Sequence, residues 1–239
     1  MNLVFDPVRH DYLADGRALP SNTEILRHMG LYSDYSFAEP VHRYRGKAVH
    51  DGCAVIDGGG EPTLELPPNP AEEILEAAHD IETGYWPAFS DFCRKEKFRG
   101  ICWEVALIDP IWGFAGMLDC LGFCGDDPIM RLVDIKSGEV PVLVGAQLAG
   151  YELLIRRGKP CKGYSLHPLV SPGVVLKKMA LRLSKDGRYK PFYETPKGRP
   201  YDDTYWTTLF RSALNCYNAR MEYGLTGPGY AQLSGGERE

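Results

Sequence analysis

The sequence lacks the features of a secreted or membrane-spanning chain. Its opening segment, MNLVFDPVRHDYLADG, contains no basic stretch that leads into an apolar run. No later segment approaches the length of about eighteen uninterrupted apolar residues that a membrane helix requires. With 239 residues, of which 44% are hydrophobic, the chain can bury a substantial core. We therefore expect a globular cytoplasmic protein with no membrane partner.

The sequence also lacks the cysteine spacing of a zinc ribbon or an iron–sulfur cluster. The chain has seven cysteines, an odd number, and no two of them form a CxxC pattern. The nearest pair, Cys120 and Cys124, is four positions apart. Because the cysteines fall in segments that otherwise resemble regular structure, we expect reduced thiols that are mostly buried in the core.

Acidic residues outnumber basic ones, and the net charge of -5 by itself argues against a nucleic-acid partner. The charge is unevenly distributed, however. Residues 140–200 contain twelve Lys and Arg against three Asp and Glu, a local charge of +9 that leaves -14 for the rest of the chain. Such a segment could bind phosphates and stack unpaired bases, or it could be a solvated surface. The side chains concerned are Arg156, Arg157, Lys159, Lys162, Lys177, Lys178, Arg182, Lys185, Arg188 and Lys190, interspersed with Tyr164, Tyr189, Phe192 and Tyr193.

The spacing of apolar residues predicts an α/β protein. Segments with helical spacing alternate with segments rich in β-branched and aromatic residues. A capping box from Ser21 to Glu24 marks the start of one helix, and Gly84 and Pro87 predict a bend or break in another. The predicted elements are a hairpin at 3–13, helices at 24–30, 40–57 and 71–97, strands at 101–109, 112–123 and 128–138, a helix at 141–158, a strand at 161–170, a hairpin at 174–194 and a helix at 201–224.

The order of these elements favours one domain. A helix, three strands, a helix and a strand follow one another, with hairpins and helices added at both ends. No internal repeat and no long linker divides the chain. We expect a single domain over residues 1–226 with its core at about 90–170, followed by a disordered tail over 227–239.

The segment with the clearest chemistry runs from Asp119 to Lys136. Side chains alternate along a strand, so Asp134 and Lys136 point to one face while Ile135 points into the core. If the strand that carries Asp119 pairs antiparallel with the next strand, both carboxylates can reach one cation, and magnesium prefers such oxygen ligands. The metal would polarise a phosphate and activate water, and Lys136 would stabilise the developing negative charge. Asp-x-Lys alone also fits an exposed ion pair on an edge strand.

In a wider context these residues resemble a known family. The run comprises Glu104, Gly113-Phe114-Ala115-Gly116-Met117-Leu118-Asp119, Val133-Asp134-Ile135-Lys136-Ser137-Gly138, Gln147 and Tyr151. It resembles the RecB-like branch of the PD-(D/E)XK nuclease superfamily, which includes phage exonucleases and CRISPR-associated relatives. The N-terminal FDPVRHDYLADGRALPSNTEIL is similar to the opening of phage members, so the resemblance covers residues 1 to about 165. It implies an αβββαβ restriction-endonuclease-like core with a mixed central sheet, here with an N-terminal hairpin and helices and a C-terminal hairpin and helix.

The resemblance assigns catalytic roles to six residues, Glu104 among them. Asp119 and Asp134 would bind the metal, and Lys136 would be the catalytic lysine. The third-strand acid is Asp here where many relatives have Glu, which the family pattern permits. Gln147 and Tyr151 are four residues apart, hence on one helix face, and would line the active site or contact DNA.

The resemblance also implies further metal contacts. Glu104, on the first core strand, would present another acid, and Ile135 would contribute its backbone carbonyl. The segment around His50 resembles the helix that delivers a histidine to the metal in RecB-like nucleases, and an imidazole ligand would fit activity with Mn²⁺ as well as Mg²⁺. Relatives with an iron–sulfur cluster carry three cysteines near the C-terminus. Only Cys161 and Cys216 follow Tyr151 in this sequence, so we expect no cluster.

The function implied is that of a metal-dependent deoxyribonuclease, an exonuclease that processes DNA ends for recombination or repair in a bacterial or phage-infected cell. A structure-specific endonuclease would use the same centre. Alternatives are a non-catalytic DNA-binding module or assembly subunit that retains the nuclease fold, and a metal hydrolase that acts on another substrate. An annealing protein or recombinase as a partner, and a homo-oligomer, stay open at this point.

Overall fold

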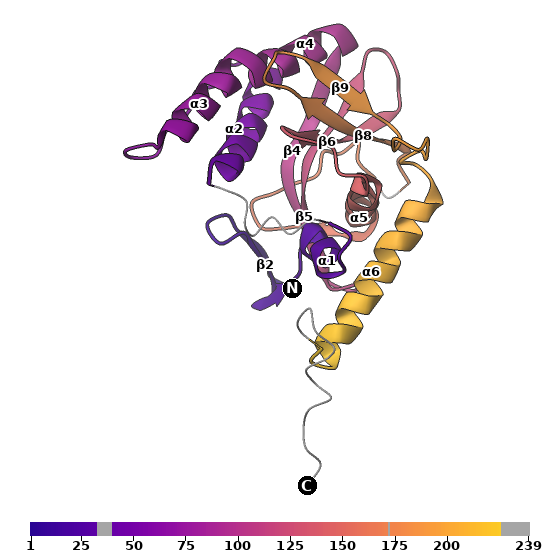
Figure 1. The fold of residues 1–239 in the computed structure, drawn as a ribbon. Helices are drawn as coiled ribbons and strands as arrows, with labels where there is room; N and C mark the ends of the chain where they lie inside the picture. Colours follow the sequence, from indigo (N-terminus) through magenta and orange to yellow (C-terminus); the bar gives the residue numbers. More distant parts are fainter. Residues whose placement is uncertain (33–39, 172, 226–239) are drawn as a thin grey trace.

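The computed structural model describes residues 1–32, 40–171 and 173–225, and its centre is a mixed sheet of six strands (Figure 1). The strand order across this sheet is β7-β4-β5-β6-β8-β9. Strands β6 and β8 are parallel, and all other neighbours are antiparallel. The strands are β4 (Phe98–Asp109), β5 (Phe114–Cys124), β6 (Met130–Lys136), β7 (Lys159–Pro160), β8 (Leu176–Leu183) and β9 (Tyr189–Phe192).

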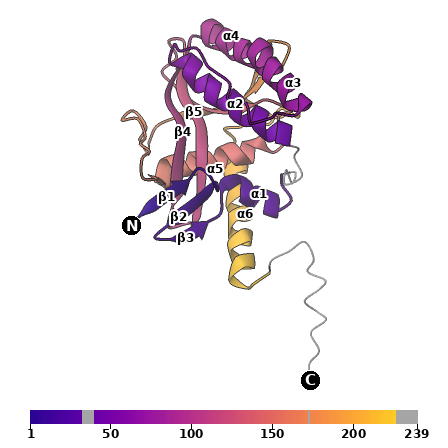
Figure 2. The ribbon, with the colours of Figure 1, turned by 90° about the vertical axis from the view of Figure 1, so that its left-hand side faces the viewer.

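A smaller antiparallel sheet precedes the central one. Its strands are β1 (Leu3–Asp6), β2 (Asp11–Ala14) and β3 (Arg17–Leu19). The β2–β3 turn has positive φ angles at Asp15 and Gly16, residue types that tolerate the left-handed region. Figure 2 shows this sheet beside β4 and β5, against which its apolar side chains pack. The predicted N-terminal hairpin and the second chain reversal are thus confirmed.

Helices cover both faces of the central sheet (Figures 1 and 2). One face packs against α2 (Pro40–Asp57) and α4 (Trp86–Glu96), with α3 (Glu72–Asp80) beside them. The other face packs against α1 (Asn22–His28), α5 (Val144–Arg157) and α6 (Thr204–Glu222). Neighbouring residues of β6 show this division. Val133 packs on the face covered by α2 and α4, and Leu132 packs on the face covered by α1, α5 and α6.

Two local sequence signals have the predicted outcome. Ser21 accepts a hydrogen bond from the backbone N–H of Glu24, while the Glu24 carboxylate accepts one from the backbone N–H of Ser21, so the capping box starts α1. The predicted bend in the long helix is a π-helical turn, η2 (Ile81–Tyr85), between α3 and α4. A Cβ at Gly84 would lie 2.0 Å from the carbonyl oxygen of Lys185, so this close approach requires glycine.

One predicted strand is wrong. Residues 161–170 form turns and irregular chain, and the strand that crosses back after α5 is β8. Lys159 and Pro160 pair with β4, and the backbone N–H of Cys161 still donates to Ala106 of that strand. The backbone N–H of Lys162 then donates to Leu3 in the small sheet, and Gly163 turns the chain with a positive φ. The predicted hairpin at 174–194 exists as β8 and β9, but it forms part of the central sheet rather than an addition to it.

The remaining expectations concern solvent exposure and the chain end. All seven cysteines are free, and Cys53, Cys102, Cys120 and Cys161 are buried. Among the described residues, no helix has the length and apolar character needed to cross a membrane. The predicted tail at 227–239 lies outside the described residues.

Candidate active site

Three acidic residues occupy one row across the middle of the central sheet. Glu104 and Asp119 occupy unpaired positions between the ladder pairs Trp103–Cys120 and Val105–Leu118 of β4 and β5. The β5–β6 ladder ends at Cys120 and Val133, so Asp119 and Asp134 are the next residues on their strands. The carboxylates of Glu104 and Asp119 both lie within 4.0 Å of His50 Nδ1, which shows that they converge. The antiparallel pairing expected for the strands of Asp119 and Asp134 is therefore confirmed.

Strand β6 separates its polar and apolar side chains as predicted. Ile135 is buried in the core on the side of α2 and α4. Asp134, which is 1% exposed, and Lys136 point the opposite way, and Lys136 Nζ lies 3.0 Å from Asp134 Oδ1 and 2.8 Å from Oδ2. Asp119 Oδ2 accepts a hydrogen bond of 2.7 Å from the backbone N–H of Ile135, which ties β5 to β6 beyond the end of their ladder.

Helix α5 adds Gln147 and Tyr151 to this cluster. Gln147 Oε1 accepts hydrogen bonds from Lys136 Nζ at 3.2 Å and from the hydroxyl of Tyr32 at 2.8 Å. Its amide nitrogen donates to the Tyr151 hydroxyl at 3.0 Å. The buried Asn22 of α1 donates to the Gln147 backbone carbonyl at 2.7 Å. The side-chain amide therefore links the catalytic lysine candidate to two tyrosines, and its hydrogen bonds with Lys136, Tyr32 and Tyr151 determine its orientation.

Helix α2 places His50 over the row of acids. His50 Nδ1 lies 3.8 Å from Asp119 Oδ1 and 4.0 Å from Glu104 Oε1, and Nε2 lies 3.1 Å from the backbone oxygen of Ile135. The helix can approach this closely because Trp86 of α4 packs directly against Gly52 and donates a hydrogen bond to the backbone of α2. All eight residues predicted for the site thus form one connected cluster.

Glu104 has an unusual backbone conformation. Its φ of 44° is in the left-handed region although it lies within β4, just after the register shift at residues 100–102. A non-glycine residue in this conformation is strained by about 1–2 kcal/mol. Such strain often occurs at functional sites, where surrounding contacts hold the residue in place.

Burial shapes the electrostatics of the row. Removal from water raises the pKa of Asp134 to about 6, and the negative charge of Asp119 adds to this effect, while Lys136 opposes it. Burial also raises the pKa of Glu104; His50 opposes this shift, and Asp51 and Asp119 reinforce it. Each carboxylate thus has a high energy in its charged form, which a bound cation would lower.

The donor set fits a divalent cation. In the described parts of the chain, the side chains of His, Cys, Asp and Glu form no group of three or more that could hold a metal ion by themselves. However, Asp134 Oδ2 is buried and accepts no hydrogen bond from the described residues, although it is in ion-pair contact with Lys136. Two carboxylates, a backbone carbonyl and an imidazole are donors that suit manganese or magnesium. Asp119, Asp134, Ile135 and His50 would hold such an ion, with Glu104 beside them.

Two connected hollows open the cluster to solvent. One, of about 600 Å³, contains Lys136 and Gln147 and is called here the lysine hollow; the other, of about 570 Å³, contains Glu104 and Tyr151 and is called the glutamate hollow. His50, Asp119, Thr23, Arg27 and Gly46 line both of them.

Cations that the sequence analysis did not select line these hollows. Arg43 and Arg45 of α2 border the lysine hollow, Lys47 borders the glutamate hollow, and Arg27 of α1 borders both. The alternation Arg43-x-Arg45-x-Lys47 ahead of His50 was a visible signal of this cationic wall. Phosphate groups entering the lysine hollow would therefore meet positive charge, whereas in the glutamate hollow Lys47 already pairs with Asp51 at 2.6 Å.

The predicted basic segment is less open than its charge suggests. Several of its cations are already neutralised in ion pairs: Arg156 and Lys178 with Glu152, Arg157 with Asp109, Arg182 with Glu139, Lys185 with Asp80, and Arg188 with Asp186. Lys159, Lys162, Lys177 and Lys190 have no carboxylate at ion-pair distance within the described ranges. Six of the ten basic residues named in the sequence analysis are therefore in ion pairs, which interrupts the positive charge along this segment.

The chain matches no protein-family model and no curated protein. The function must accordingly be inferred from the cluster, the two hollows and the charges around them.

Proposed function

We propose that this protein is a divalent-metal-dependent deoxyribonuclease, and that it acts as an exonuclease on DNA ends. The observation that carries the proposal is the alignment of Glu104, Asp119 and Asp134 in one row, with Lys136 beside them and His50 above. Phosphodiester hydrolysis needs this combination of carboxylates and a cation next to the scissile phosphate.

The fold supports the same proposal. Strands β4, β5 and β6, helix α5 and strand β8 follow one another in the order of the αβββαβ core, and α4 precedes them. We therefore propose a restriction-endonuclease-like core of the RecB-like branch, with β8 as its last strand. Residues 1–32 and α2 then supply Tyr32, Arg27 and His50 to the site.

The side chains would divide the chemistry among them. A bound Mg²⁺ or Mn²⁺ supplies Lewis-acid activation of the phosphate and of a water molecule. Lys136 would neutralise charge on the phosphate oxygen, and Gln147 and Asp134 hold its ammonium group in position. Arg27, Arg43 and Arg45 would orient the DNA backbone at the mouth of the lysine hollow.

The test compares cleavage of end-labelled linear DNA and covalently closed circular DNA in the presence of Mg²⁺ or Mn²⁺. The variants are Asp134→Asn and Lys136→Ala, with the matched controls Asp186→Asn and Lys162→Ala at surface positions. We expect both site variants to lose activity by about 100-fold or more, while the controls retain it. Circular dichroism of each variant verifies that it is folded.

The pattern of products decides among the hypotheses. Loss of linear DNA alone supports an exonuclease, and cleavage of the circle as well would move the assignment to an endonuclease. If folded wild-type protein binds DNA but cuts neither substrate with either metal, the catalytic proposal fails and a binding module replaces it.

A further inference from the structure

A row of cations extends from the candidate active site to the edge of the sheet. The register pairs Lys136 of β6 with Arg182 of β8, and Arg182 with Lys190 of β9. Paired residues project on the same face, and neighbouring strands lie about 4.8 Å apart. Arg182 and Lys190 therefore continue the face that carries Lys136, one and two strands further out.

These two cations are accessible to a ligand. Lys190 is exposed, and its ammonium group lies 4.8 Å from the centre of the Phe192 ring. The Arg182 side chain is 37% exposed and pairs at 3.0 Å with Glu139, whose side chain is 85% exposed. A surface ion pair of this kind contributes little stability, so a phosphate can replace the Glu139 carboxylate at low cost.

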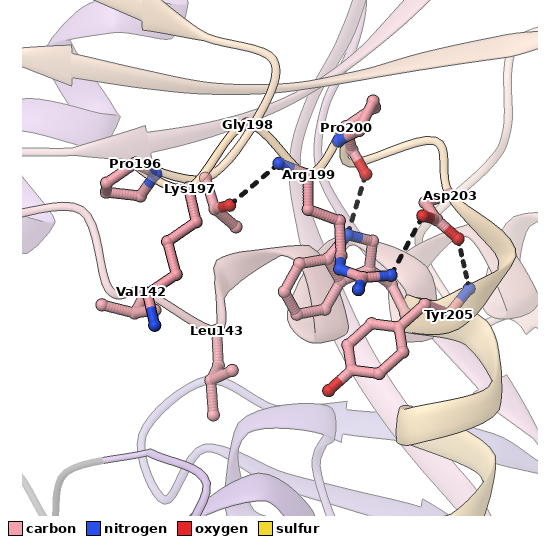
Figure 3. Close-up of a pocket in the computed structure, with 11 residues that line it drawn as sticks. Val142, Leu143, Pro196, Lys197, Gly198, Arg199, Pro200, Asp203 and Tyr205 are labelled. Carbon is pink, nitrogen blue, oxygen red and sulfur yellow. Dashed lines mark hydrogen bonds and ion pairs between the residues drawn. The ribbon is translucent and has the colours of Figure 1, made fainter.

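A separate pocket, of about 620 Å³, lies between the residues that precede α5 and the loop that follows β9, and we call it the Trp206 pocket (Figure 3). A tight turn over Thr195–Gly198 forms one wall, with hydrogen bonds from Gly198 N to Thr195 O and from Arg199 N to the Thr195 hydroxyl. Figure 3 shows the Arg199 guanidinium over the Tyr205 ring, 4.2 Å from its centre, and paired with Asp203 at 3.1 Å.

The pocket offers a stacking surface with positive charge. Tyr205 is 43% exposed, and the Arg199 side chain is 45% exposed, so both planar groups are reachable from solvent. Lys197 is exposed on the same turn and lines the pocket. Because hydrogen bonds and the ion pair to Asp203 already order this surface, a ligand would lose little further conformational entropy on binding.

One short segment joins the pocket to the active site. Gly138, Glu139 and Pro141 line the lysine hollow, and the next residues, Val142 and Leu143, line the Trp206 pocket. A chain leaving the lysine hollow over this rim would pass Arg182 and then meet the pocket.

We propose that Arg182, Lys190 and the Trp206 pocket form a binding surface for single-stranded nucleic acid next to the lysine hollow. This inference rests on the proposed nuclease function and specifies the state of its substrate. Arg182, Lys190 and Lys197 contact phosphates, and an unpaired base stacks on the Arg199–Tyr205 pair. Stacking of this kind requires bases that are free of a duplex, and cationic side chains interleaved with aromatic ones match the alternation of phosphate and base.

The test measures binding of fluorescent single-stranded DNA by anisotropy in EDTA, so that no cleavage occurs. Two lengths are compared, about four and about twelve nucleotides, the longer of which can reach beyond the lysine hollow. The variants are Lys190→Ala, Tyr205→Ala and Glu139→Gln, and Lys162→Ala beside β1 is the matched control.

For the longer oligonucleotide, we expect Lys190→Ala and Tyr205→Ala to raise the dissociation constant about fivefold or more. Glu139→Gln should lower it, because the competing carboxylate is removed. The shorter oligonucleotide should bind all variants alike. Equal affinity of every variant and the Lys162→Ala control for the longer strand would overturn the proposal, as would stronger effects on duplex than on single-stranded DNA.

The binding test is separable from the test of catalysis. If the variants alter binding as expected but wild-type protein cuts no DNA, the surface stands and the nuclease proposal fails. If cleavage depends on Asp134 and Lys136 but Lys190→Ala and Tyr205→Ala leave single-strand binding unchanged, the nuclease proposal is supported and the proposed binding surface is refuted.

Discussion

At the scale of single residues, Glu104 is the residue whose conformation conflicts most with its surroundings. An ordinary strand residue has φ near -120°, whereas Glu104 has 44° and lies opposite Asp119 in the row of acids. Its side chain is 40% exposed at the glutamate hollow, so little packing would be lost on truncation. The strain is therefore best explained by the position that the carboxylate must occupy at the site.

Truncation of Glu104 should separate stability from activity. Glycine has no steric cost at this φ, but it gains more entropy than alanine in the unfolded chain. We expect the steric effect to be the larger of the two, so the free energy of unfolding of Glu104→Gly should exceed that of Glu104→Ala by about 1 kcal/mol. Both variants should cut DNA more slowly than wild type because both lack the acid. Urea unfolding and nuclease assays measure the two effects. Equal stability of the Gly and Ala variants would show that the strain is no larger than the entropy that glycine gains in the unfolded chain.

At the scale of elements, a buried charge cluster holds α5 against β8. Glu152 of α5 accepts from Lys178 of β8 at 2.7 Å and from Arg156 at 2.6 Å. Lys178 is almost fully buried and also donates to the backbone oxygen of Tyr201. Burial by itself would raise the pKa of Glu152, but the hydrogen bonds from Lys178 and Arg156 outweigh it and hold the pKa below its ordinary value.

This cluster gives the protein a pH-dependent stability. Since the folded pKa of Glu152 is depressed, its contribution is complete above about pH 4.5 and disappears as the pH falls through the lowered value. Lys178→Met should destabilise the protein by about 3 kcal/mol at pH 7, because a buried carboxylate loses a partner. The difference in the free energy of unfolding between wild type and Lys178→Met should become smaller as the pH falls and Glu152 becomes neutral.

Denaturant unfolding from pH 7 down to about pH 3 measures this effect. Lys177→Met is the control, since Lys177 is the adjacent residue of β8 and has no carboxylate at ion-pair distance among the described residues. The measurements must continue to about pH 3, because the contribution of Glu152 is lost only below its ordinary pKa. A constant difference between the unfolding free energies of wild type and Lys178→Met down to that pH would contradict the assigned role of Glu152.

At the scale of the whole molecule, positive charge is concentrated around the candidate site although the net charge is negative. The net charge is -5, yet Arg27, Arg43, Arg45 and Lys47 surround the hollows, and Arg182 and Lys190 continue from Lys136. An acidic remainder disfavours nonspecific contacts elsewhere, so nucleic acid should be guided to the cationic mouth of the site.

Binding of single-stranded DNA should accordingly depend on salt. If about six cations contact phosphates, the logarithm of the binding constant should fall with the logarithm of salt concentration at a slope of about -4. Titrations in EDTA at several KCl concentrations measure this slope. Arg43→Ala should make it less steep by about 0.7, whereas Lys162→Ala should leave it unchanged. A slope near zero for wild type would contradict phosphate binding at the hollows.

Sequence patterns of short range determined much of the site. The period of two along residues 130–136 was sufficient to place Asp134 and Lys136 on one face and Ile135 in the core. The spacing of four along α5 placed Gln147 beside Tyr151. The capping box at Ser21 was likewise local, because it depends on hydrogen bonds between residues three positions apart. The interruption at Gly84 was also predicted from the sequence, although this glycine packs against the distant Lys185.

Tertiary structure alone decided what depends on distant partners. Residues 161–170 and 174–183 both have apolar content suited to a strand. Residues 174–183 contain β8 because this segment pairs with β6, whereas Lys162 in the other segment bonds to the N-terminal sheet. Tyr32 reaches Gln147 across 115 positions of sequence, and Glu104 adopts its conformation opposite Asp119 on another strand. The neutralisation of Lys178 and Arg182 also depends on residues far along the chain. Sequence periodicity specifies which face a side chain occupies, whereas register and packing between elements specify which groups it meets.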